Sequence, residues 1–204
     1  MRDEPIPQGE ATVATLARRT WVALCHHPVL NRQGMVVATA ITNLDLHDIA
    51  RAARTYGLAG FIVITPVERQ RQLANRIVSH WRGGSGTDRS EHRSTAIALI
   101  RVLPDLDGAI SVLTDLHGVT PLLVATSARP GRETMGEGPF LSDRQADPRP
   151  VLLLFGTGWG LADPVLDRAE ILLGPLLGHS DYNHLSVRSA VSIYLDRLFG
   201  IRTQ

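Results

Sequence analysis

Short apolar runs alternate with longer amphipathic stretches along nearly the whole of this chain. The runs with the length and apolar content of strands are residues 21–26, 36–41, 61–65, 95–102, 121–126, 151–155 and 170–173. The stretches with apolar side chains at helical spacing are residues 44–56, 66–81, 104–117, 163–168 and 183–199. This alternation predicts an α/β fold with a mainly parallel sheet and helices on both of its faces. Sheets of this kind bind ligands at the carboxyl ends of their strands.

The length and composition fit one domain outside the membrane. The chain has 204 residues, of which 44% are hydrophobic, and its mean hydropathy is +0.01. No apolar run approaches the roughly 18 residues that span a bilayer. Residues 1–18 begin polar, contain Pro5, Pro7 and Gly9, and lack the apolar segment of a signal peptide. They are therefore predicted to be a disordered lead-in to a domain of residues 19–204, and the expected location is the cytoplasm.

The basic and sulfur-containing residues exclude several chemistries. All 21 basic residues are arginine, so neither a Schiff-base lysine nor the lysine of a phosphate-binding P-loop is present. Arginine suits bidentate contact with phosphate, but genomic base composition produces the same bias and is favoured as its explanation. The net charge of +1 indicates no nucleic-acid surface by itself. The lone Cys25 excludes a disulfide framework and a cysteine-rich metal site.

Glycines alternate along residues 156–161, directly after the most apolar run at 151–155. Alternating glycines expose backbone N–H groups and let a ligand approach the main chain closely. The segment lies late in the chain and lacks the spacing of a Rossmann dinucleotide fingerprint. It is either a tight strand-to-helix turn or one wall of a nucleotide site.

The segment at residues 179–190 leads from a bend near Pro175 into the last predicted helix, which begins at Asn183 or Ser186. The spacing of His179 and His184 does not match a zinc-binding helix, so no metal site is predicted. Both histidines also fit as hydrogen-bonded loop residues. Asp181 is a candidate general base, with an ordinary exposed loop carboxylate as the alternative.

The third notable segment leads into the predicted helix at residues 44–56, for which Asn43 or Asp45 is the predicted N-cap. Arg51 and Arg54 are three residues apart and therefore neighbours on one helix face. They either form a solvated face, with Asp48 pairing Arg51, or present two guanidinium groups to a substrate phosphate or hydroxyl.

In this order, the three segments resemble the three motifs of SPOUT-class RNA methyltransferases. Asn43 with residues 49–51 is similar to the first motif, the glycine segment 156–161 to the second, and Pro175 with residues 185–187 to the third. Residues 23–28 and 180–188 extend the resemblance to a bacterial group of SAM-dependent RNA methyltransferases, found alone or fused to tRNA guanine-N1 methyltransferase. The resemblance covers residues 20–200.

The resemblance implies a C-terminal trefoil knot, a SAM pocket formed by the second and third motifs, an RNA substrate, and a homodimer in which Arg51 faces the partner's cofactor. The residues it assigns to the cofactor are Leu154, Gly156, Thr157, Gly158, Gly160, Leu161, Pro175, His184, Leu185 and Ser186. It makes Arg51 the candidate catalytic residue, which polarises a ribose hydroxyl or holds a phosphate. Asp48, Asp181 and His184 are the second choices for accepting the proton, and Asn43 and Arg54 are expected to contact RNA.

Two questions about function stay open on the sequence. Many ribose 2′-O methyltransferases of the class carry asparagine at the position of Ser186 and serine at that of His184, so the target is a ribose hydroxyl or a base nitrogen. A SAM-binding accessory module without activity of its own is the main alternative. A nucleotide-dependent oxidoreductase on a flavodoxin-like sheet is a second alternative, which the late and short glycine segment argues against.

Overall fold

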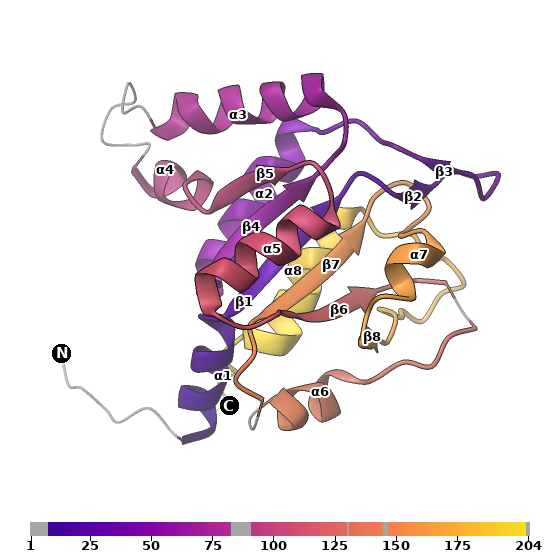
Figure 1. The fold of residues 1–204 in the computed structure, drawn as a ribbon. Helices are drawn as coiled ribbons and strands as arrows, with labels where there is room; N and C mark the ends of the chain where they lie inside the picture. Colours follow the sequence, from indigo (N-terminus) through magenta and orange to yellow (C-terminus); the bar gives the residue numbers. More distant parts are fainter. Residues whose placement is uncertain (1–7, 83–90, 130, 145–146, 203–204) are drawn as a thin grey trace.

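The computed structural model describes residues 8–82, 91–129, 131–144 and 147–202 (Figure 1). Its central sheet is built from β1 (Thr20–Cys25), β4 (Gly60–Ile64), β5 (Ile100–Leu103), β6 (Leu122–Thr126), β7 (Val151–Gly156) and β8 (Ile171–Leu173). The strand order is β5-β4-β1-β7-β6-β8, and all neighbouring strands are parallel. A separate antiparallel hairpin, β2 (Val29–Leu30) and β3 (Val36–Val37), follows β1.

Helices cover both faces of the sheet, as predicted. One face packs against helices α1 (Gln8–Ala17), α2 (Asn43–Thr55), α3 (Glu68–Arg82), α4 (Glu91–Ile97), α6 (Glu137–Arg144) and α8 (Val187–Phe199). The other face packs against α5 (Leu106–His117) and α7 (Asp163–Leu166). In Figure 1, α5 lies in front of the sheet and α8 behind it.

Two apolar cores explain why the predicted strands read as unbroken apolar runs. Along β1, Val22 and Leu24 join the core beneath α2 and α8, whereas Ala23 and Cys25 join the core beneath α5. Successive side chains of a strand point to opposite faces, so a strand covered on both sides is apolar at every position. Burial also raises the pKa of the Cys25 thiol to about 12, which makes it an inert core residue.

The prediction of disorder for residues 1–18 is wrong over α1. This helix ends on Leu16 and Ala17, each 3% exposed, and Val13 packs against the same core. The apolar residues at 13, 16 and 17 have helical spacing, so they form one face that α8 and the sheet cover. Residues 1–7 lie outside the described part of the chain.

The strand predicted at residues 95–102 is also wrong in its first half, since α4 continues to Ile97 and β5 begins at Ile100. Residues 95–98 include two alanines, and alanine has the highest helix propensity. The helices α4 and α6, which begin at Glu91 and Glu137, have no counterpart among the predicted helices.

Helix starts differ from the predicted ones by a few residues. The N-cap of α2 is Thr42, whose hydroxyl accepts a hydrogen bond from the Asp45 N–H, rather than Asn43 or Asp45. The helix α8 begins at Val187 with Ser186 as its N-cap, which agrees with the predicted start at Ser186 and not with the alternative start at Asn183. The threading of the C-terminal segment through a knot stays a prediction.

The strand order places a crevice between β1 and β7. The chain leaves β1 for β4 on one side, and it leaves β7 for β8 on the other side, beyond β6. Connections that diverge from two adjacent parallel strands leave a gap at the strands' carboxyl ends, where α/β proteins bind ligands.

Across the described ranges, none of the helices combines the length and apolarity needed to cross a bilayer.

Candidate functional site

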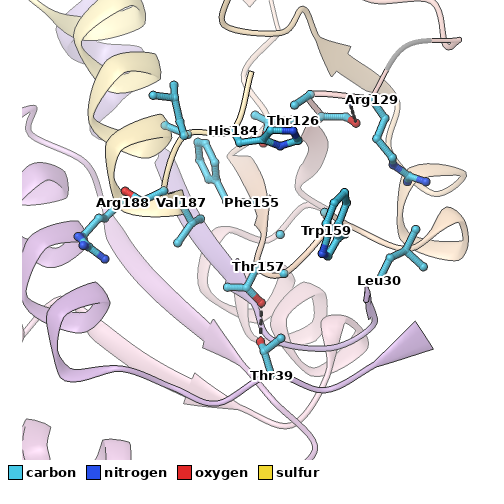
Figure 2. A pocket seen from close by; sticks show the side chains of 18 of the residues that line it. Leu30, Thr39, Thr126, Arg129, Phe155, Thr157, Trp159, His184, Val187 and Arg188 are labelled. Atoms are coloured by element: carbon cyan, nitrogen blue, oxygen red, sulfur yellow. Dashed lines mark hydrogen bonds between the residues drawn. The ribbon is translucent and has the colours of Figure 1, made fainter. Parts of the chain in front are cut away.

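A cavity of about 1040 Å³ opens at the carboxyl ends of β1, β6 and β7 (Figure 2). Its walls come from the hairpin and loop after β1, the end of β6, the glycine loop after β7, and the segment that leads into α8. Among the residues that line it are Leu30, Arg32, Thr39, Asp45, Thr126, Arg129, Phe155, Thr157, Gly158, Trp159, Leu176, His184, Leu185, Val187 and Arg188. These segments are distant in sequence and meet because the sheet aligns their strand ends.

Backbone hydrogen bonds tie the glycine loop to the β2–β3 hairpin. Leu30 N–H donates to the Gly160 carbonyl over 2.9 Å, and Trp159 N–H donates to the Leu30 carbonyl over 2.9 Å. Gly158 has a φ of +59°, and a Cβ there would lie 2.8 Å from the Leu30 oxygen. Glycine is therefore required at 158 both by its backbone conformation and by the close approach of the hairpin.

We expect Gly158→Ala to weaken ligand binding in the cavity as well as the fold. An alanine at this φ strains the backbone by about 1–3 kcal/mol, and its methyl group would push Leu30 away from the loop. The matched control is Gly118→Ala at the end of α5, where φ is +71° and nothing lies within 4 Å of the added Cβ.

Calorimetric titration with SAM and thermal denaturation measure the two effects. Both variants should lose stability, but Gly158→Ala alone should lower SAM affinity. Equal SAM affinity in the two variants would show that the contact between loop and hairpin does not shape the binding site.

The floor of the cavity is a chain of hydrogen bonds that begins at a buried histidine. The Nδ1 atom of His26 lies 3.0 Å from Thr39 Oγ1, which lies 2.5 Å from Thr157 Oγ1. Thr157 Oγ1 in turn donates to the Cys25 carbonyl over 3.2 Å. Figure 2 shows the Thr39 and Thr157 hydroxyls meeting below the cavity. These bonds hold the glycine loop against the ends of β1 and the hairpin.

His26 is fully buried, and this burial lowers its pKa to about 4, against the opposing effect of the Asp45 carboxylate. The unfolded chain takes up a proton near the usual histidine pKa of about 6.5, so protonation favours unfolding below that pH. We expect the free energy of unfolding of the wild type, compared with His26→Gln, to fall by roughly 3 kcal/mol as the pH drops from about 6.5 to about 4.

Denaturant titrations of both proteins across this pH range measure the difference. Other titrating groups act in both proteins, so they cancel in the comparison. Parallel stability curves for the two proteins would contradict a neutral, buried His26.

One side of the cavity carries a charged cluster that joins α2 to α8. Asp45 is 6% exposed and accepts hydrogen bonds from the Thr42 hydroxyl over 2.6 Å and from Arg188 Nη1 over 3.3 Å. The Nε atom of Arg188 also lies 3.6 Å from a carboxylate oxygen of Asp48. Arg188 thus balances the one carboxylate in the described wall of the cavity.

Arg129 lies on the opposite side of the cavity from Arg188 (Figure 2). Its Nη2 atom donates to the Leu161 carbonyl over 2.7 Å and to an Asp163 carboxylate oxygen over 3.4 Å. Its buried Nε atom has no hydrogen-bond partner in the described structure. Arg32, on the turn of the hairpin, is exposed and pairs with no carboxylate of the described residues. Of these two arginines, Arg32 therefore offers unpaired positive charge to a ligand, whereas the charge of Arg129 is balanced by Asp163.

The structure brings seven of the predicted cofactor residues to the cavity wall: Gly156, Thr157, Gly158, Gly160, His184, Leu185 and Ser186. The other three do not line it. Leu154 is fully buried in the sheet and Leu161 is 1% exposed, because both pack into the core beneath α5 and α7. Pro175 lies in the segment after β8, outside the lining residues.

The predicted catalytic and RNA-binding residues lie outside the cavity of their own chain. Arg51, Arg54 and Asn43 are exposed on α2, and Asp181 is exposed in the segment before α8. Asp48 is exposed too and approaches the cavity only through Arg188. The prediction that Asp48 pairs with Arg51 is wrong, since its ion-pair partner is Arg188.

Sequence reasoning missed several polar residues of the cavity wall, among them Thr39, Asp45, Arg129 and Arg188. In the sequence, Asp45 is predicted only as a possible N-cap of its helix. Arg188 stands in the predicted third motif, so its proximity to that motif was the available signal. Thr39 lies in the run 36–41 that was predicted as a strand, of which only Val36–Val37 (β3) is one. Arg129 lies in a loop in which no sequence pattern indicates a site.

Comparisons with known proteins agree with this architecture. A family profile for SAM-dependent RNA methyltransferases matches residues 19–200. A tRNA (guanine-N(1)-)-methyltransferase of Oleidesulfovibrio alaskensis is 42% identical over 183 residues, which are 90% of this chain and 42% of that protein. An uncharacterized protein of Aquifex aeolicus is 36% identical over 180 residues, which are 88% of each chain. The chain thus spans less than half the length of the curated methyltransferase it matches.

Solved structures share the fold at low sequence identity. A protein described as a probable methylase family protein from Haemophilus influenzae aligns with a TM-score of 0.60 and 17% identity, over 89% of this chain and 65% of that one. The SpoU methyltransferase AviRb from Streptomyces viridochromogenes, in complex with AdoMet, aligns with a TM-score of 0.52 and 14% identity, over 88% and 58% of the two chains. Together with the profile match over residues 19–200, this parallel α/β architecture shows that the chain belongs to the family of SAM-dependent RNA methyltransferases.

Proposed function

We propose that the cavity between the glycine loop and the start of α8 binds SAM and that the protein transfers its methyl group to an RNA nucleotide. The observation that carries the proposal is the meeting of residues 156–160 and 183–188, the predicted second and third motifs, in one cavity. We further propose that the protein acts in the cytoplasm, where SAM and RNA are both present.

The residues of the cavity fit SAM. Phe155, Leu176, Leu185 and Val187 supply apolar walls, and the alternating glycines leave the main chain open to a nucleoside. Ligand pockets typically enclose about 300–1,000 Å³, so a cavity of about 1040 Å³ has room for a cofactor and part of a second molecule. Asp45 is paired with Arg188, so the described wall carries no unbalanced negative charge.

That charge balance suits methyl transfer. When bound, SAM supplies a methyl group on a sulfonium cation whose leaving group is a neutral thioether. Because the positive charge on sulfur decreases in the transition state, an anionic pocket would favour the ground state instead. The protein must hold the acceptor atom in line with the methyl group. Such positioning lowers the activation free energy by up to roughly 7–11 kcal/mol.

In a homodimer, Arg51 can act in the cavity of the other subunit. It is exposed on α2, lies outside the cavity of its own chain and has no ion-pair partner among the described residues. Leu44, on the same helix, is 60% exposed and leaves apolar surface for a second copy. We infer that Arg51 reaches the cavity of the partner subunit and holds the acceptor hydroxyl or the adjacent phosphate. Arg54 and Asn43 would then contact the RNA nearby.

The acceptor atom must lose a proton, and Asp45 is the best-placed carboxylate to receive it. It lines the cavity, whereas Asp48 and Asp181 do not. Thr42 and Arg188 hold both of its oxygens in place. A carboxylate fixed at the cavity wall meets the geometric requirement for a general base better than one on an exposed loop.

Two measurements test the proposed function. Calorimetry should detect SAM binding to the purified protein, and tritium should pass from labelled SAM into total RNA of a strain that lacks the gene. SAM binding without incorporation would favour an accessory role instead. Mass spectrometry of nucleosides from the deletion strain and its parent would then identify the missing modification as a 2′-O-methylated ribose or a methylated base.

A further inference from the structure

We propose that Trp159, His184 and Tyr182 form a stacking platform for the base of an unpaired nucleotide of the RNA substrate, at the outer edge of the cavity. The inference rests on the proposed function and adds the form in which the RNA is recognised. The platform joins the glycine loop after β7 to the segment before α8.

The three rings form a continuous series. The ring centroids of Trp159 and His184 are 5.9 Å apart with an interplanar angle of 62°, and those of His184 and Tyr182 are 5.4 Å apart with an angle of 77°. Figure 2 shows Trp159 and His184 side by side at the cavity. Tyr182 does not line the cavity, so the series runs from the cavity wall outward.

The exposure of these rings is unusual for this chain. Trp159 is 51% exposed and Tyr182 is 69% exposed, and within the described ranges no other tryptophan, tyrosine or phenylalanine side chain is as open to solvent. All four phenylalanines are buried. Large aromatic rings favour burial or an interface, so two exposed rings beside one cavity indicate a ligand that covers them.

The charges beside the platform suit a nucleotide. Arg32 lines the cavity two residues after Leu30, which bonds to Trp159, and it is exposed with no ion-pair partner among the described residues. Arg129 also lines the cavity, but it is already paired with Asp163 over 3.4 Å, so Arg32 is the arginine left to meet a phosphate. Proteins recognise single-stranded RNA by stacking unpaired bases on aromatic rings while arginines hold the phosphates. A base-paired helix keeps its bases stacked on one another and would not reach the platform.

The adenine of SAM is the alternative occupant of the Trp159 ring, and Tyr182 separates the two cases. A ring outside the cavity wall has no role in holding a cofactor inside it. Tyr182→Ala should therefore leave SAM affinity unchanged and raise the concentration of total RNA at half-maximal methylation by roughly ten- to a hundredfold. Trp159→Ala should have the same effect on the RNA, and Tyr182→Phe should restore the wild-type value.

Leu177→Ala is the matched control, because Leu177 lies on the same segment and is 69% exposed, like Tyr182, but has no ring. It should behave as the wild type. Unchanged RNA dependence in Tyr182→Ala, or equal weakening in Leu177→Ala, would overturn the platform. A loss of SAM affinity in Trp159→Ala would assign that ring to the cofactor instead.

A binding measurement keeps this test separate from the proposed function. Fluorescence anisotropy of a labelled, mixed-sequence single-stranded RNA should show binding by the wild type and weaker binding by Tyr182→Ala, with little binding of the same sequence as a duplex. If the wild type binds the single strand in this way but methylates no RNA, the proposed function fails and the platform stands. If it methylates RNA and Tyr182→Ala binds the strand as tightly as the wild type, the platform fails and the proposed function stands.

Discussion

Arg51→Ala should abolish methyl transfer to RNA, with a rate at least about a hundredfold below that of the wild type, while leaving SAM affinity unchanged. The reason is its place in the fold: Arg51 is exposed on α2 and does not line the cavity of its own chain, so it does not touch a cofactor there. It acts, on our proposal, on the acceptor nucleotide in the partner's cavity. Calorimetric titration with SAM and tritium transfer to total RNA measure the two quantities.

Arg76→Ala provides the matched control for the loss of one exposed positive charge. Arg76 lies on α3, is exposed and has no ion-pair partner among the described residues. Its variant should methylate RNA nearly as fast as the wild type. Wild-type turnover in Arg51→Ala would reject the catalytic assignment.

Mixing subunits of two variants tests whether Arg51 acts in the cavity of the partner subunit. Arg51→Ala supplies an intact cavity, and Gly158→Ala supplies an intact Arg51 with a damaged cavity. In a dimer with shared sites, mixed dimers regain activity that neither variant has alone. No recovery on mixing, or a monomer in light scattering, would contradict the shared site.

Asp45→Asn should lower the rate of methyl transfer by roughly 10²- to 10⁴-fold at unchanged SAM affinity, because it removes the carboxylate that accepts the proton. Asparagine keeps the shape of the side chain and an oxygen for the Thr42 hydrogen bond, so the fold should persist. Tritium transfer to total RNA and calorimetric titration with SAM measure the rate and the affinity.

Asp48→Asn distinguishes this role from a purely structural one, because both carboxylates pair with Arg188 and only Asp45 lines the cavity. If the two variants lose activity equally and become equally unstable, the carboxylates serve to hold α2 against α8. If Asp48→Asn loses more, the proton acceptor is Asp48. Thermal denaturation of both variants separates instability from slow chemistry.

The layers of the fold were predictable because they depend on patterns that are local in sequence. Apolar runs such as residues 151–155 indicate strands covered on both faces, and β7 confirms that run. Predictions failed where local signals competed. Residues 95–98 carry both a strand-like apolar content and alanines that favour a helix, and packing against α2 and α3 selected the helix α4.

The candidate site was predictable in its loops and not in its charges. Glycines at 156, 158 and 160 indicated a loop that a ligand approaches closely, and the structure brings that loop to the cavity. Asp45 and Arg188 are 143 residues apart, and nothing in the sequence near either one indicates that they meet. Thr39 and Thr157 are 118 residues apart in sequence, and no local pattern indicates that they form a hydrogen bond.

By itself, the sequence determined the parallel α/β architecture and the two segments that line the cavity, because side-chain periodicity and glycine content act over a few neighbouring residues. The tertiary structure alone decided which polar groups face the cavity and which face solvent. Asp45 became a wall residue and Asp181 an exposed one through the alignment of strand ends in the sheet, which brings distant loops together at one edge. That alignment is a property of the whole sheet and is encoded in no single segment.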